Sequence, residues 1–398
     1  MPASAAVKLN QGRDKSLRRR HPWVFSKAIA SVSGNPAPGD LVRVEDSTGG
    51  FLAWGFYSPQ SQIRVRAVSF DEASLPDEEF IRALVRKSCS RRQALAAQGN
   101  DGVRLVDSEG DLLPGLVVDR YGRFVVISIS SQAMEACRDW ILKELFELFP
   151  DCSFYERSDT RARQKEGLEE RSGVIRGEEP PEVIYVLEGG QVRIPVEIPH
   201  GHKTGAYLDQ RAARIYSSTL CKGRSVLNCF SYTGGFGLWA LKGGASSVVN
   251  VDVSGPALEA ARQGVVENHL DPGRCKFIRA DVFEFLRRQV KEGRKYDVVI
   301  LDPPKFAESV GALKRACRGY QDIARLGFEL LGEGGRLLTF SCSGLVEPAL
   351  FQKVTADAAL DAGVQAQIRA TLRQDSDHPV SLPCPESFYL KGLDVEVI

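Results

Sequence analysis

Two short motifs in the second half of the chain combine residues that could carry out covalent chemistry. Asp302 and the two prolines after it directly follow the apolar run 296–301, and Cys342 follows a second apolar run at 335–340. Proline lacks a backbone N–H and fixes φ, so the chain must leave a sheet where the two prolines stand. Both motifs therefore lie at strand ends, which is where open α/β sheets bind ligands. An acid and a thiol at neighbouring strand ends suggest chemistry on a planar base.

The thiol of Cys342 is a candidate nucleophile. Addition of a thiolate to C6 of a pyrimidine makes C5 nucleophilic enough to take a methyl group from a sulfonium. Methylation of an exocyclic amine needs no covalent step, so the cysteine bears on which atom is methylated. Asp302 could hold a flipped-out base and Phe306 could stack on it. A buried, inert cysteine and an Asp-Pro-Pro sequence that merely ends a strand are the alternative interpretations.

The segment 225–237 has the pattern of a strand, a glycine-rich turn and the start of a helix. Asp252 and Asp281 stand at the ends of the next two strands, where acids can meet ribose hydroxyls and an adenine amine. The glycine spacing is not that of a dinucleotide fingerprint, and no Walker lysine follows it. A site for ribose and adenine without phosphate indicates S-adenosylmethionine, and ordinary helix-capping acids are the alternative.

A polar segment at 203–211 precedes the first strand of this region and is placed to lie over the cofactor. The residues that we expect to bind the cofactor are Thr204, Asp209, Phe230, Tyr232, Gly234, Asp252, Asp281, Val282 and Asp302.

A basic triplet near the N-terminus, with aromatic residues after it, indicates contact with RNA phosphates. A solvated surface is the alternative interpretation of such a triplet. The residues that we expect to bind RNA are Arg18, Arg19, Arg20, Lys305 and Phe306.

The nine cysteines and five histidines are scattered along the chain. His200 and His202 are spaced like weak metal ligands, but no acid or cysteine partner completes a site, so we expect no metal. The cysteine pattern is typical of reduced thiols rather than of disulfides. No apolar segment is long enough for a signal core or a membrane span, so we expect a soluble, cytoplasmic protein. The net charge of +1 neither favours nor excludes nucleic acid.

The pattern of the 398 residues changes twice along the chain and predicts three domains. Short strands with glycine and proline between them predict a small β-barrel-like domain at 1–70. Mixed strands and helices predict a central α+β domain at 71–195. Regular alternation of strands and helices predicts a doubly wound, mostly parallel α/β domain at 196–398.

Individual elements can also be predicted. We expect helices at 75–99 and near 131–149, and an exposed loop with some helix at 161–181. The strands expected in the last domain are at 225–229, 247–251, 276–279, 296–301 and 335–340.

Several segments together resemble the bacterial ribosomal RNA large-subunit methyltransferase I family, the cytosine-C5 methyltransferases of 23S rRNA. The resemblance implies an N-terminal PUA domain for RNA, a central α+β domain and a C-terminal class I methyltransferase domain. It also implies S-adenosylmethionine, a substrate in 23S rRNA or its large-subunit precursor, and a homodimer. The matching segments span nearly the whole chain and lie at 20–26, 112–119, 203–205, 208–211, 228–234, 302–306 and 341–343.

One departure concerns the base that removes the C5 proton. Two-cysteine RNA cytosine methyltransferases carry a second cysteine after the prolines, where this chain has Lys305 and Phe306. In the tRNA uracil-C5 methyltransferases, which this domain also resembles, a glutamate late in the chain serves, and Glu386 lies in a comparable place. We therefore take Cys342, Asp302 and Glu386 as the candidate catalytic residues.

Two other functions stay open at this point. The enzyme could methylate an exocyclic amino group of adenine or guanine, and Cys342 would then be incidental. The chain could instead be a catalytically inactive RNA-binding factor in ribosome assembly, although the acids at three strand ends argue against this.

Overall fold

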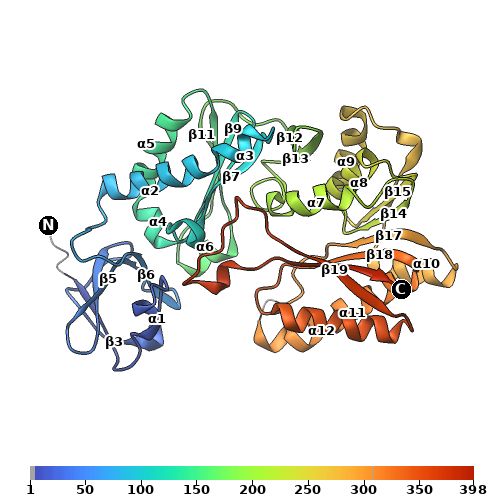
Figure 1. Ribbon diagram of the computed structural model, residues 1–398. Helices are drawn as coiled ribbons and strands as arrows, with labels where there is room; N and C mark the ends of the chain where they lie inside the picture. The colour runs from blue at the N-terminus through green and yellow to red at the C-terminus, as the bar shows by residue number, and fades with distance from the viewer. Residues whose placement is uncertain (1–4, 308) are drawn as a thin grey trace. The chain divides into compact units, whose positions relative to one another are not determined.

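The computed structural model describes residues 5–307 and 309–398 and folds them into two compact units (Figure 1). The first unit contains the described part of Met1–Glu182 together with Glu197–Ala206 and Ser376–Ser387. The second unit contains Val183–Val196, Tyr207–Asp375 and Phe388–Ile398. One segment from the middle of the sequence and one from near its end thus belong to the first unit. The predicted three-domain division stays a prediction.

The first unit begins with a six-stranded sheet of order β2-β6-β5-β4-β1-β3. Alternate side chains such as Val7, Val42, Val44 and Val65 point into one core, as expected for strands with one buried face. The predicted small β domain is therefore present. Its strands are β1 (Ala6–Leu9), β2 (Trp23–Phe25), β3 (Ile29–Ser33), β4 (Leu41–Glu45), β5 (Phe51–Tyr57) and β6 (Ile63–Ser69).

A five-stranded sheet of order β11-β10-β9-β8-β7 follows in the same unit. The predicted helices are present, but each is divided into two. The strands are β7 (Gly102–Asp107), β8 (Leu116–Tyr121), β9 (Phe124–Ile129), β10 (Ser153–Ser158) and β11 (Arg171–Arg176). The helices are α2 (Glu78–Arg91), α3 (Gln93–Ala97), α4 (Gln132–Ala136), α5 (Arg138–Leu148) and α6 (Arg161–Lys165).

The prediction of an exposed loop over 161–181 was wrong for part of that range. Strand β11 pairs antiparallel with β10 and forms one edge of the five-stranded sheet. Arg171 and Ser172 are exposed. Edge strands are often charged. A polar composition therefore concealed a strand that pairs with β10, the strand before it in the sequence.

The second unit is built around a seven-stranded sheet of order β16-β15-β14-β17-β18-β20-β19. The five strands expected from the sequence are present and pair in parallel. Strands β19 and β20 were not expected, and both pair antiparallel. The strands are β14 (Ser225–Cys229), β15 (Ser247–Asp252), β16 (Cys275–Arg279), β17 (Tyr296–Leu301), β18 (Leu331–Ser341), β19 (Ala366–Arg373) and β20 (Lys391–Val397).

Helices cover both faces of this sheet, with α8 and α9 on one side and α11 and α12 on the other (Figure 1). The core places strand residues such as Leu227 and Val299 against Tyr320 and Phe328 of α11. Burial on both faces explains the continuous apolar runs in the central strands. The helices are α7 (Arg211–Ser218), α8 (Gly235–Lys242), α9 (Gly255–Glu267), α10 (Val282–Lys291), α11 (Leu313–Glu329) and α12 (Pro348–Asp361), and β12 (Ile184–Glu188) and β13 (Val192–Val196) form a separate hairpin.

The described helices were also compared with the length and apolarity that a membrane span requires. None of those in residues 5–307 and 309–398 meets both requirements.

Candidate active site

Two neighbouring strands of the second unit deliver Asp302 and Cys342 to the same edge of the sheet. Asp302 directly follows β17 and Cys342 directly follows β18, and Leu301 lies opposite Thr339 in the parallel register. Both side chains are partly exposed, whereas Pro303 is buried. The acid and the thiol are therefore accessible at adjacent strand ends.

Buried serines on either side fix the position of Cys342. Ser341 and Ser343 are fully buried. The Ser343 hydroxyl accepts a hydrogen bond from the backbone N–H of Ala307 at 3.3 Å and lies 3.1 Å from the Tyr320 hydroxyl. Because Ala307 belongs to the turn after Asp302, this serine fastens the two motifs to each other.

The predicted segment 208–211 meets the same edge of the sheet. The side-chain amide of Gln210 donates a 2.9 Å hydrogen bond to Asp302 Oδ1. Asp209 accepts a 2.6 Å hydrogen bond from the Tyr389 hydroxyl, and Arg211 forms a 2.9 Å ion pair with Asp375. Asp209 and Gln210 are both 2 % exposed, so the segment is a buried wall of the site.

The glycine-rich turn after β14 has an uncommon backbone. Phe230, Tyr232 and Gly234 have φ values of +57°, +46° and +78°. Such conformations cost roughly 1–3 kcal/mol for residues other than glycine and persist mainly where a ligand site needs them. Asp252 stabilises the turn, since its carboxylate accepts N–H groups from Tyr232 at 2.8 Å and Ser254 at 2.9 Å.

Asp281 is the N-cap of α10, because its Oδ1 accepts the Glu284 N–H at 3.0 Å. This is the capping role that the sequence left open, and it occupies one carboxylate oxygen. The side chain of Asp281 is exposed, while that of Val282 after it is buried. Their roles in binding a cofactor stay predictions.

Two buried polar atoms test whether this edge of the sheet fits the cofactor. Within the described part of the chain, Gln210 Oε1 and Ser231 Oγ have no hydrogen-bond partner. Buried polar atoms are rarely left unpaired, so both favour a polar ligand. The ribose hydroxyls and the amino group of S-adenosylmethionine offer donors of the required kind. The residues present therefore fit this cofactor.

Tyr207 is a residue of this site that was not predicted from the sequence. Burial, reinforced by the nearby Asp302 carboxylate, raises the pKa of Tyr207 above its ordinary value, so its phenol stays neutral and can donate a proton to a hydrogen bond. Its ring packs edge-on against Tyr232, with centroids 5.5 Å apart. A charge on Cys342 also raises the pKa of this phenol. Although the segment 203–211 was expected to lie over the cofactor, no motif in it marked this tyrosine.

A cavity of about 510 Å³ opens beside the turn that follows Asp302. Its aromatic and basic side chains match the requirements of a stacked base and a phosphate. The Phe306 ring lies 6.0 Å from Phe283 and 4.7 Å from Tyr320, measured between centroids. The lining residues are Phe283, Lys305, Phe306, Ser309, Ala312, Arg315, Ala316 and Gly319.

Thr204 lies in the first unit rather than the second. Its hydroxyl donates a 2.5 Å hydrogen bond to Asp119 and lies 3.0 Å from the Tyr121 hydroxyl. The side chain is 3 % exposed. The threonine thus takes part in a buried network of that unit, and its cofactor role stays a prediction.

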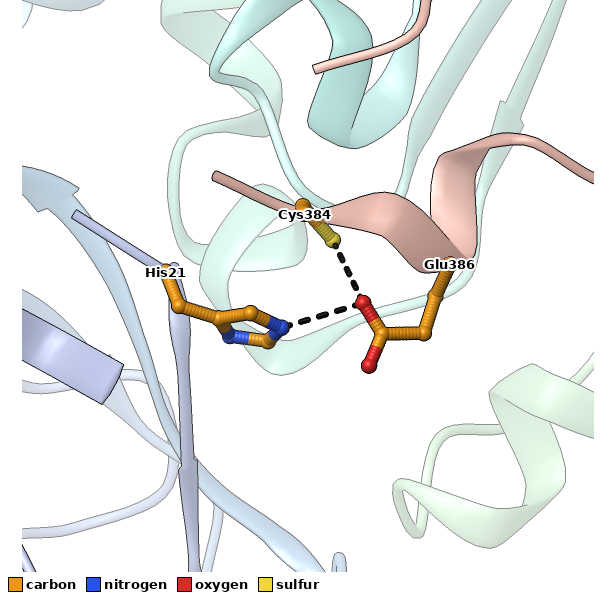
Figure 2. Close-up of side chains that lie close together, drawn as sticks. All are labelled: His21, Cys384 and Glu386. Carbon is orange, nitrogen blue, oxygen red and sulfur yellow. Dashed lines mark hydrogen bonds and ion pairs between the residues drawn. The ribbon is translucent and has the colours of Figure 1, made fainter. Parts of the chain in front are cut away.

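Glu386 also lies in the first unit, where it meets His21 and Cys384 (Figure 2). Its Oε2 lies 3.1 Å from His21 Nε2 and 3.6 Å from Cys384 Sγ. Partial burial pushes the pKa of Glu386 upward, but its own backbone N–H and His21 outweigh this, so the pKa lies below its ordinary value. Burial, with Glu109 and Glu386 nearby, raises the pKa of Cys384 to about 12.

These three side chains are close enough to hold a metal ion, since their ligand atoms lie within 4.8 Å of one another. The hydrogen bonds of His21 argue against this use. The Trp23 N–H donates to His21 Nδ1 at 3.2 Å, so the proton of a neutral imidazole belongs on Nε2. A metal on Nε2 would require the proton on Nδ1. The geometry favours a hydrogen-bonded triad.

The three arginines of the triplet differ in their contacts, since Arg18 forms ion pairs with two aspartates. Arg18 forms ion pairs of 2.5 Å with Asp14 and 2.7 Å with Asp46. Arg19 and Arg20 are exposed. The latter two are therefore the better candidates for phosphate contacts.

Two family models match the chain. A PUA-like domain model matches residues 7–70, and an S-adenosylmethionine-dependent methyltransferase model matches residues 163–369. The first range covers the six-stranded sheet, and the second covers the strand ends described above.

Several known proteins are similar to this chain over nearly its whole length. The chain is 54% identical over 393 residues to a ribosomal RNA large subunit methyltransferase I from Aeromonas hydrophila, covering 98% of this chain and 99% of that protein. It is 48% identical over 396 residues to the Aliivibrio fischeri protein of the same description, covering 99% of this chain and 100% of that protein. A solved methyltransferase complexed with SAH has a TM-score of 0.85 at 25% identity and covers 98% of this chain and 100% of that chain.

Proposed function

Because the chain belongs to the ribosomal RNA large subunit methyltransferase I family, we propose that it methylates cytosine C5 in 23S rRNA through a covalent adduct at Cys342. The coarser activity, S-adenosylmethionine-dependent methylation of rRNA, follows from the family itself. The observation that carries the finer proposal is a partly exposed thiol, set between two buried serines, at the strand end next to Asp302.

The reaction begins when the Cys342 thiolate adds to C6 of the cytosine. The S–C6 bond forms, and the C5=C6 π electrons move into the ring towards N3. Asp302 enters this step protonated, donates a hydrogen bond to N3 and passes its proton to N3 as the electrons arrive there. Gln210 orients the carboxyl group of Asp302 through its 2.9 Å hydrogen bond. N3 returns the proton to Asp302 when the cytosine ring is restored. When bound, S-adenosylmethionine supplies an electrophilic methyl group, which C5 accepts. A base then removes the C5 proton, the C5=C6 bond re-forms and the thiolate leaves.

Glu386 is the proposed proton acceptor. Its lowered pKa keeps the carboxylate ionised at neutral pH, as an acceptor requires, but also makes it a weak base. Its hydrogen-bond partner His21 could then take part in passing the proton on.

RNA is proposed to contact both matched domains. The PUA-like domain carries Arg19 and Arg20, and the methyltransferase domain carries Lys305 and Phe306 at the aromatic and basic cavity. Arg18 is expected to add less because it is already paired with two acids. The homodimer that the resemblance implies and the cytoplasmic location expected from the sequence both stay predictions.

The decisive experiment uses 23S rRNA fragments that contain 5-fluorocytosine. Fluorine at C5 cannot leave as a proton, so a C5 methyltransferase becomes trapped on the RNA after methyl transfer. We expect a denaturation-resistant complex for the wild type and none for Cys342→Ala. Cys317→Ala is the matched control, since this partly exposed cysteine on α11 stands outside the two motifs.

Other outcomes would support the alternatives. Methylation by Cys342→Ala, without any trapped complex for the wild type, would favour transfer to an exocyclic amine. Failure of the wild type to bind S-adenosylmethionine in calorimetry would favour an inactive RNA-binding assembly factor.

A further inference from the structure

Lys391 lies beside the cysteine motif although it is distant in sequence. It is the first residue of β20, which pairs antiparallel with β18, and it stands directly opposite Ser341. The side chain is 5 % exposed. Strand pairing therefore brings a buried cation to the residue before Cys342.

Two short hydrogen bonds hold the ammonium in this place. Lys391 Nζ donates to the Ser343 carbonyl at 2.7 Å and to the Tyr389 carbonyl at 2.7 Å. Ser343 directly follows Cys342, so the ammonium is fixed to the peptide next to the thiol. Both acceptors are neutral and do not balance its positive charge.

The surrounding charges favour a negative group at Cys342. Burial, opposed by Cys342 and assisted by Lys305, lowers the pKa of Lys391 to about 8. Tyr207 and Tyr320 face the cysteine as well, and burial raises the pKa of both, so they remain uncharged at neutral pH. Asp302 faces Tyr207 from the neighbouring strand end.

We propose that Lys391 is a positioning residue that holds Cys342 as a thiolate for attack on the pyrimidine. The inference rests on the proposed covalent function. When Lys391 starts as a neutral amine, the proton of the Cys342 thiol moves to Lys391 Nζ, so the two residues together gain or lose no proton. When the lysine is already an ammonium, the thiol proton passes to water. The same ammonium stabilises the thiolate when it leaves C6.

The test measures the thiolate itself rather than turnover. The rate at which iodoacetamide alkylates Cys342 is followed against pH, with peptides resolved by mass spectrometry, in the wild type, Lys391→Met and Lys391→Arg. Only the thiolate reacts. We expect the pH at which the alkylation rate is half-maximal, the midpoint, to rise by about one unit in Lys391→Met. This shift corresponds to about tenfold slower alkylation near pH 7. Lys391→Arg should keep a midpoint near that of the wild type.

An unchanged midpoint in folded Lys391→Met would overturn the inference. If the methionine variant does not fold, the wild type alone remains decisive. Its midpoint must lie below the ordinary thiol value of about 8.5, and a midpoint at or above that value overturns the inference too.

The two proposals can fail separately. Retained methylation in Cys342→Ala contradicts the covalent function whatever the alkylation shows. A trapped 5-fluorocytosine complex together with an unshifted alkylation midpoint supports the covalent function and contradicts the role of Lys391.

Discussion

Arg214 and Glu188 form a two-pronged ion pair inside the second unit. Arg214 Nε donates to Glu188 Oε1 at 2.9 Å, and its NH2 group contacts the other oxygen. Trp239 Nε1 donates to the same carboxylate at 2.6 Å, and Arg214 also donates to the Tyr207 carbonyl at 2.9 Å. The pair thus joins the β12–β13 hairpin and α8 to the backbone of a residue beside Asp302.

Replacement of Glu188 by glutamine should lower the free energy of unfolding of this unit by about 3–5 kcal/mol, because Arg214 would remain buried without its counter-charge. Urea unfolding followed by tryptophan fluorescence measures the change. Glu259→Gln is the matched control, since the Glu259–Arg262 pair is exposed and should contribute less than about 1 kcal/mol. Equal stability of the two variants would contradict the prediction.

The same carboxylate predicts how stability depends on acid. Burial alone would raise the pKa of Glu188, but Arg214 outweighs it, and the pKa lies below its ordinary value of 4.5. A depressed carboxyl pKa stabilises the fold above the unfolded-state pKa and loses this effect as the pH falls through the folded-state pKa. As the pH falls below about 5, we expect the free energy of unfolding to decrease more steeply for the wild type than for Glu188→Gln. If the free energy of unfolding depends on pH in the same way in both proteins, the Glu188 carboxylate makes no such contribution.

Asp252→Ala should weaken the binding of S-adenosylmethionine. The carboxylate is expected to hold the ribose, with each charged hydrogen bond worth about 1.5–3 kcal/mol, and it also orders the turn through Tyr232 and Ser254. Calorimetry should show a loss of affinity of at least about tenfold. Asp271→Ala is the control, as its side chain is 58% exposed. Unchanged affinity in Asp252→Ala would remove this residue from the site.

The double variant Arg19→Ala/Arg20→Ala should weaken binding to all RNA sequences alike. Loss of two phosphate contacts should reduce the slope of log K against log salt by roughly 1.4–1.8. Arg18→Ala should change the slope less, because this side chain already pairs with Asp14 and Asp46. Filter binding over a range of salt concentrations measures the RNA affinity and this slope for each protein. Identical slopes in the wild type and the variants would identify the triplet as a solvated surface.

Glu386→Gln should trap a methylated covalent adduct on ordinary cytosine RNA, because the C5 proton would have no acceptor. The adduct is detected as a denaturation-resistant complex that carries a labelled methyl group. Glu347→Gln, on an exposed residue before α12, serves as the control. Normal turnover in Glu386→Gln would exclude it as the proton acceptor and leave it as the hydrogen-bond partner of His21.

Local pattern alone determined much of this protein. All five parallel strands of the second unit were predicted. The inner strands read as apolar runs because the sheet is covered on both faces, whereas the edge strand β16 is only partly buried. The prolines after Asp302 marked a strand end, and the seryl-cysteinyl-seryl motif marked another. Since parallel strands share one carboxyl edge, the sequence also predicted that Asp302 and Cys342 would lie close together.

Tertiary structure alone decided which distant residues complete the site. Strand β20 brings Lys391 to Cys342 across about fifty residues, and folding of the segment before α7 brings Tyr207 and Gln210 to Asp302. Thr204, three residues before Tyr207, instead belongs to the first unit. Motif spacing records which residues are neighbours along the chain. Burial, charge and proton affinity depend on neighbours in space, which only long-range strand pairing and packing supply.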